Sequence, residues 1–173
     1  MFVGRFTDIK NPLYAIDVIK ECHRLDDRFE GLICGDGRIA DRVQSKIQSE
    51  GLGDCVHLLG NREDVNELYM ADDYLIMPSL FEGFPFVLVE AQANGLPCVA
   101  SADVIPQEAD VGIGLVTHVN LEERAEVWAQ KCLARKREEK IDMQKAQNAV
   151  KMAGYDMEDT AKWLADFYTE KWV

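Results

Sequence analysis

Residues 74–100 read YLIMPSLFEGFPFVLVEAQANGLPCVA and contain the parts of a parallel α/β unit. The apolar run Tyr74–Met77 has the length of a buried strand, and Phe86–Ala93 combines apolar residues with good helix formers. Asn94-Gly95 is a stop signal for that helix, and Pro97–Ala100 is a second apolar run of strand length. Two buried strands joined through a helix predict a parallel sheet with helices on its faces.

The same alternation extends to both ends of the chain. The other expected strands are Phe2–Gly4, Phe29–Cys34, Val56–Leu59 and Ile113–Thr117. The other expected helices of this region are Pro12–Leu25, Ile39–Gln48 and Val65–Met70. From Glu122 to Trp172 we expect two or three further helices, interrupted near Gly154. Six such strands predict an α/β fold with a Rossmann-like, doubly wound parallel sheet, and residues 1–173 are expected to form a single domain.

Composition argues against several classes of protein. The formal net charge of -12 opposes nucleic-acid binding, and the one basic run, Arg135–Arg137, is followed at once by two glutamates. The five cysteines form no C-x-x-C pair, which predicts buried free thiols in a reducing compartment instead of disulfides or a zinc site. The histidines have no partners at metal-binding spacing, so no metal site is expected. No apolar stretch reaches the ~18 residues of a membrane span.

Chemistry-bearing residues follow two of the expected strands. In a doubly wound sheet of order 3-2-1-4-5-6, ligands bind beyond the carboxyl ends of the first and fourth strands, where the order reverses. Those strands end near Gly4 and Met77. Arg5 and Lys10 follow the first strand and suit a pyrophosphate, which arginine can bind through two hydrogen bonds.

The segment after the fourth strand offers complementary groups. Gly83 allows a ligand to approach the backbone closely, and Pro85 suits the first position of a helix. The helix start then provides amides that favour anions, at Phe84, Phe86 and Val87. Glu82 and Glu90 flank this start, and their carboxylates can accept hydrogen bonds from the paired hydroxyls of a sugar or a ribose.

A series of short motifs occurs along the chain in a fixed order. It comprises Gly4-Arg5 with Lys10-Asn11, Gly35-Asp36-Gly37, Leu59-Gly60, Pro78-Ser79, Glu82-Gly83-Phe84-Pro85, Glu90-Ala91 and Gly95-Leu96-Pro97. Over about residues 2–116 this series resembles family 4 of the GT-B glycosyltransferases, most specifically in the E-x7-E element from Glu82 to Glu90. The resemblance implies the C-terminal, donor-binding half of a GT-B fold.

The resemblance also implies a role for each residue of the site. Arg5 and Lys10 would be catalytic, binding the donor diphosphate and assisting departure of the leaving group. Glu82 would contact the hydroxyls of the donor sugar, and Glu90 would hold those of the ribose. Further donor-binding residues would be Gly4, Gly83, Phe84, Phe86 and Val87. Such enzymes retain anomeric configuration and need no bound metal or cofactor besides the substrate, a UDP- or GDP-sugar.

Full members of the family also have an N-terminal Rossmann-like domain, which binds the acceptor. We expect that missing domain upstream, because Met1 stands almost at the end of the first strand. The complete enzyme would transfer a hexose or related sugar to a saccharide or lipid-linked acceptor in polysaccharide or glycoconjugate synthesis, whereas the isolated chain is expected to be inactive. The expected location is the cytoplasm, and peripheral association of the full-length enzyme with the inner face of the plasma membrane is left open.

Two alternative functions remain. The segment Gly35–Ala40 fits the relaxed dinucleotide fingerprint G-x-G-x-x-A, which is typical of an NAD(P)-binding module. However, its glycines follow the second strand instead of the first, and Asn61-Arg62 stand where an acidic residue is expected, with Glu63 one position late. The other alternative is a catalytically silent sensor of nucleotide sugars.

Overall fold

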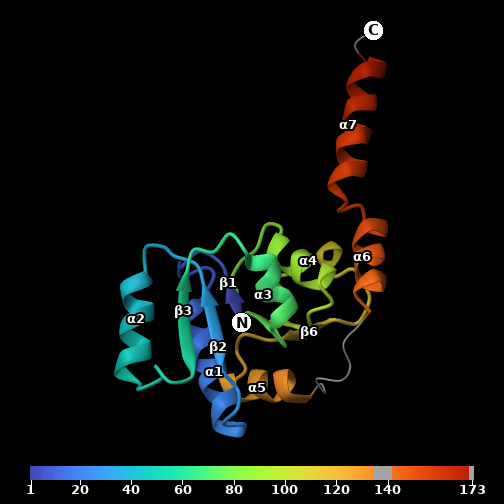
Figure 1. Cartoon of the computed structure of the whole chain (residues 1–173). Helices are drawn as coiled ribbons and strands as arrows, with labels where there is room; N and C mark the ends of the chain where they lie inside the picture. Colours follow the sequence, from blue (N-terminus) through green and yellow to red (C-terminus); the bar gives the residue numbers. More distant parts are fainter. Residues whose placement is uncertain (135–141, 172–173) are drawn as a thin grey trace.

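Short parallel strands form the centre of the fold (Figure 1). The computed structural model describes residues 1–134 and 142–171. One three-stranded sheet has the order β1 (Phe2–Val3), β2 (Gly31–Cys34) and β3 (Val56–Gly60). The other has the order β4 (Leu75–Met77), β5 (Cys98–Ser101) and β6 (Val116–Val119).

The two sheets meet between β1 and β4. The backbone N–H of Ile76 donates to the carbonyl oxygen of Met1 at 2.8 Å, which places β4 beside β1. The strands therefore follow the expected order 3-2-1-4-5-6, but the continuous six-stranded sheet that we predicted is divided into two sheets of three. Both residues of β1 pair with β2, whereas the backbone bonds at the junction with β4 are made by Met1, which precedes β1.

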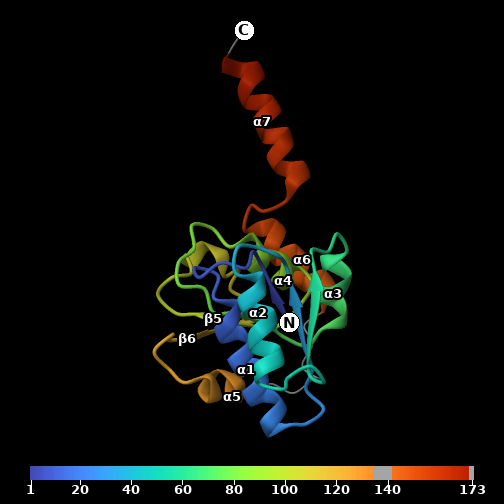
Figure 2. The ribbon, with the colours of Figure 1, turned by 90° about the vertical axis from the view of Figure 1, so that its left-hand side faces the viewer.

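Helices cover both faces of the strands (Figures 1 and 2). The core of one face contains residues of α1 (Pro12–Leu25), α2 (Ala40–Ser49) and α5 (Ala125–Ala134). The core of the other face contains residues of α3 (Val65–Ala71), α4 (Phe86–Ala93) and the 3-10 turn η1 (Gln107–Ala109). Helix α6 (Met143–Met152) packs on α4, and α7 (Met157–Lys171) follows it.

Successive side chains along the strands belong alternately to the two hydrophobic cores. Ile76 of β4 belongs to the α1–α2–α5 core, whereas its neighbours Leu75 and Met77 belong to the core under α3 and α4. In β5, Val99 and Ala100 divide in the same way. Successive side chains of a strand point to opposite faces, so apolar runs are needed here because both faces are covered.

All of the strands and helices expected up to residue 100 are present, with ends shifted by up to two residues. The predicted start of the last strand is wrong by three residues, because we expected Ile113–Thr117 and β6 begins at Val116. Gly112 and Gly114, with φ of 74° and 72°, place the segment before it in the left-handed region, where a strand cannot continue. All five cysteines are buried and free, as predicted.

The C-terminal helices differ in how they contact the rest of the molecule. Helix α6 ends at Met152 and α7 begins at Met157, so the expected interruption near Gly154 is confirmed. Figures 1 and 2 both show α7 standing clear of the sheets and the other helices. Part of the expected helical region, residues 135–141 and 172–173, lies outside the described residues. No helix in the described part of the chain combines the length and apolarity that a membrane crossing requires.

Candidate functional site

The loops after β1 and β4 lie against each other, as the strand order requires. The N–H of Leu80 donates to the carbonyl oxygen of Ile9 at 2.7 Å and joins the two loops directly. The N–H of Gly4 donates to Cys34 of β2 at 3.0 Å, which anchors the start of the first loop. The predicted convergence of these two chain segments is therefore present.

An ion pair connects the two loops through side chains. The ammonium of Lys10 lies 2.7 Å from both carboxylate oxygens of Glu82. The Glu82 side chain is 4% exposed, whereas that of Lys10 is 29% exposed. A buried carboxylate needs such a partner because desolvation penalises its charge. Of the predicted charged site residues, these two are in direct contact.

A cavity of about 300 Å³ opens beside this ion pair and is here called the first cavity. Its lining residues are Phe2, Val3, Gly4, Arg5, Lys10, Met77, Ser79, Glu82, Phe84, Pro85, Phe86 and Val87. Most of the predicted donor site is thus gathered in one place. Arg5 is exposed, and within the described part of the chain its side chain makes no ion pair or hydrogen bond, so its guanidinium can meet an anion.

The start of α4 supplies backbone donors to the same cavity, although with one correction. The N–H groups of Phe84 and Val87 have no acceptor among the described residues. The amide of Phe86, which we expected to be free, donates to the carbonyl oxygen of Phe84 at 3.2 Å. Pro85 caps the helix instead of opening it, which tightens this turn and occupies the Phe86 amide. Gly83 is exposed beside the cavity and is not among its lining residues.

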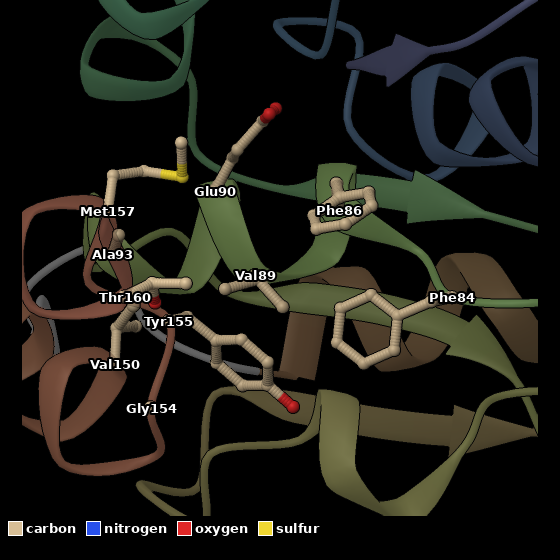
Figure 3. A pocket seen from close by; sticks show the side chains of 10 residues that line it. All are labelled: Phe84, Phe86, Val89, Glu90, Ala93, Val150, Gly154, Tyr155, Met157 and Thr160. Carbon is tan, nitrogen blue, oxygen red and sulfur yellow. The ribbon is translucent and has the colours of Figure 1, made fainter. Parts of the chain in front are cut away.

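We expected Glu90 to share one crevice with Arg5, Lys10 and Glu82. That prediction is wrong, because Glu90 lies in a different cavity. This second cavity, of about 660 Å³, lies between α4 and the α6–α7 corner (Figure 3). The Tyr69 hydroxyl donates to Glu90 at 3.1 Å. Burial, reinforced by the negative charge of Glu90, raises the pKa of Tyr69 above its ordinary value of 10.0. Phe84 and Phe86 line both cavities and separate them.

Tyr155 is a residue of this region that the sequence analysis missed. Its ring lies 5.3 Å from that of Phe84, and its hydroxyl donates to the carbonyl oxygen of Glu108 at 2.8 Å. It therefore connects the α6–α7 corner to the loop before α4 and to η1. No sequence signal marked it, because Tyr155 stands in a helix connection far along the chain from both partners.

The glycines of the dinucleotide-like segment have a packing role. A Cβ atom on Gly37 would lie 2.5 Å from the carbonyl oxygen of Phe6, and one on Gly35 would overlap the carbonyl oxygen of Gly4. Both glycines have positive φ, at 139° for Gly35 and 158° for Gly37. They are required because the turn after β2 packs directly on the backbone of the loop after β1. This close approach accounts for the motif without a dinucleotide.

Comparison with known proteins places the chain among glycosyltransferases. EpsF of Bacillus subtilis, whose name describes it as a glycosyltransferase, is 34% identical over 172 residues, which cover 98% of this chain and 44% of EpsF. An Escherichia coli enzyme, the UDP-Gal:alpha-D-GlcNAc-diphosphoundecaprenol alpha-1,3-galactosyltransferase, is 37% identical over 103 residues, covering 57% of this chain and 26% of its own. The chain thus spans less than half the length of these relatives.

A solved structure confirms the fold. The pneumococcal O-GlcNAc transferase GtfA, in complex with UDP and GlcNAc, superposes with a TM-score of 0.76 at 17% identity over 98% of this chain and 35% of that protein. The fold is accordingly that of one half of a GT-B glycosyltransferase. The family model for glycosyl transferases group 1 matches residues 1–111, which is well over half of the sequence. The chain therefore belongs to the family of glycosyl transferases group 1.

Proposed function

We propose that this chain is the donor-binding domain of a retaining, family 4 glycosyltransferase whose donor is a nucleoside diphosphate sugar. The observation that carries the proposal is the first cavity, where the Lys10–Glu82 ion pair stands beside Arg5 and the amides of Phe84 and Val87. Cations and backbone amides suit a diphosphate, and an adjoining carboxylate suits sugar hydroxyls. The site thus offers both kinds of partner that such a donor requires.

In this proposal Arg5 and Lys10 stabilise the charge that develops on the diphosphate as the bond to the sugar breaks. Such preorganised positive charge stabilises the transition state more than the ground state. Lys10 then divides its three N–H donors between the donor and Glu82, whose oxygens can also accept bonds from the sugar. Gly4 and Gly83 leave room for the donor at the two loops, and no metal or cofactor takes part.

The nucleoside would extend from the first cavity toward the second. Glu90 stands at the second cavity, where a carboxylate can accept both hydroxyls of a ribose. Phe84 and Phe86 adjoin both cavities and would contact the donor between its diphosphate and its nucleoside. The resemblance to family 4 supports this placement of Glu90.

The setting proposed for the complete enzyme is polysaccharide or glycoconjugate synthesis. The named Escherichia coli relative uses UDP-Gal and a lipid-linked acceptor, and GtfA has been crystallised with UDP. By that analogy we propose a UDP- or GDP-sugar as donor and a saccharide or lipid-linked acceptor. The same proposal includes an acceptor domain that precedes this one. It also includes a cytoplasmic location, with peripheral association at the inner face of the plasma membrane.

Calorimetric titration of the 173-residue chain with UDP, GDP and NAD tests the donor class. We expect binding of a nucleoside diphosphate and a loss of at least about tenfold in affinity for Arg5→Ala, because a charge-assisted hydrogen bond contributes about 1.5 kcal/mol or more. Glu90→Gln should also weaken binding, whereas Glu63→Gln is the matched control because Glu63 is exposed and lies outside both cavities. A preference for NAD would instead establish the dinucleotide-binding alternative.

Product assays separate an enzyme from a silent sensor. The isolated chain should form no glycosylated product, whereas the full-length enzyme should do so with the anomeric configuration of its donor retained. A full-length protein that binds the donor without transferring or hydrolysing it would be a sensor, and inversion would exclude the retaining mechanism.

A further inference from the structure

A buried hydroxyl without a partner lies in the wall of the first cavity. Ser79 is 1% exposed, and its Oγ is the one buried side-chain oxygen or nitrogen without a hydrogen bond within residues 1–134 and 142–171. The other buried polar side chains are paired: Ser101 donates to Met77 at 3.3 Å, and Gln92 makes three hydrogen bonds. Because buried hydroxyls are normally satisfied, Ser79 requires an explanation.

The fold holds Ser79 where a ligand of the first cavity can supply that partner. Ser79 follows β4 directly after Pro78, and the neighbouring N–H of Leu80 is fixed to Ile9 in the loop after β1. The residue therefore stands at the junction of the two loops that form the site. It lines the first cavity together with Lys10 and Glu82.

The groups around the first cavity indicate which kind of ligand atom would form a hydrogen bond with the Ser79 hydroxyl. Arg5 and the amides of Phe84 and Val87 are donors with no acceptor among the described residues. The carboxylate of Glu82, the charged acceptor of the cavity, is already bonded through both oxygens to Lys10. A wall of unengaged donors favours an anion that is rich in oxygen acceptors.

We propose that Ser79 is a donor-binding residue, whose Oγ donates a hydrogen bond to an oxygen of the donor's diphosphate. The assignment rests on the proposed function, since it places the diphosphate in the first cavity. Rotation about the χ1 angle of a serine moves only its hydroxyl between staggered positions, so the ligand can be met without movement of the backbone. Ser79 thereby adds an uncharged donor beside Arg5 and Lys10.

The test compares Ser79→Ala with Ser101→Ala in the 173-residue chain. Loss of a hydrogen bond to a charged oxygen should lower the affinity for UDP or GDP by about tenfold in Ser79→Ala. The melting temperature of the unliganded variant should not fall, because alanine removes a hydroxyl that has no partner in the fold. Ser101→Ala should behave oppositely, with a lower melting temperature and unchanged affinity, because it loses the bond to Met77.

Each other outcome has a definite meaning. Nucleotide affinity of Ser79→Ala within about twofold of the wild type, with the wild type binding normally, would overturn this assignment and leave the proposed function intact. A fall in melting temperature comparable to that of Ser101→Ala would overturn it too, by revealing a structural partner. A wild-type chain that binds neither UDP nor GDP would refute the proposed function and the role of Ser79 with it.

Discussion

Replacing Lys10 by methionine should destabilise the fold more than replacing its partner Glu82 by glutamine. In Lys10→Met the carboxylate of Glu82, which is 4% exposed, loses a partner that lies 2.7 Å from both of its oxygens. Removing one member of a buried ion pair costs about 3–5 kcal/mol. We take the lower end, about 3 kcal/mol, because the Lys10 side chain is 29% exposed and water reaches the pair.

In Glu82→Gln the amide keeps the shape of the side chain, and the ammonium of Lys10 can turn to water. The expected cost is about 1 kcal/mol, the contribution of an ordinary hydrogen bond. For a domain of this size each kcal/mol lowers the melting temperature by about 2–4 °C, so the two variants should differ by about 4–8 °C.

Urea denaturation followed by tryptophan fluorescence measures these free energies, and Lys10→Met/Glu82→Gln completes a double-mutant cycle. The double variant should be more stable than Lys10→Met alone, because it leaves no buried charge without a partner. Equal destabilisation by the two single variants, or additive effects in the cycle, would refute the view that a buried carboxylate is held by this lysine.

Three further results are expected. Tyr155→Phe should cost about 1 kcal/mol in unfolding free energy and speed hydrogen exchange around Glu108, and an unchanged stability of this variant would exclude a role for the hydroxyl. Tyr155→Leu, which also removes the ring contact, should cost more, and a loss equal to that of Tyr155→Phe would exclude a contribution of the ring. Gln92→Leu should cost about 2–4 kcal/mol in a urea titration, because it leaves backbone groups including the N–H of Val111 unpaired, and a neutral result would contradict that bonding. The raised pKa of Tyr69 contributes stability that is complete below pH 10, its unfolded value, and is lost as the pH rises above it; ultraviolet titration should show Tyr69 ionising only with unfolding, and a normal titration in the native state would contradict its burial.

Local sequence patterns were sufficient to predict most of the strands and helices. The apolar runs around Ile33, Ile76 and Val99 are buried strands because both faces are covered, and the stop signal Asn94-Gly95 ends α4 as predicted. The division into two sheets could not be foreseen, since it depends on the backbone bonds of Met1 with Tyr74 and Ile76 at the junction, which no sequence pattern specifies.

The candidate site was predicted in part. The strand order brought Arg5, Lys10 and Glu82 to one cavity, because the carboxyl ends of neighbouring parallel strands share an edge. That Glu90 turns toward Tyr69 in a second cavity depends on the packing of α3, α4 and α6, which spacing alone does not encode. The roles of these residues toward a donor stay predictions.

Phe84 lines both cavities, and this shared position has a thermodynamic consequence. Its ring adjoins the first cavity and, supported by Tyr155, the second. A compound that settles on one side and tilts the ring alters the shape available on the other. If a ligand in the first cavity changes the affinity of the second cavity for its own ligand by some factor, thermodynamic linkage requires the second ligand to change the affinity of the first cavity by the same factor.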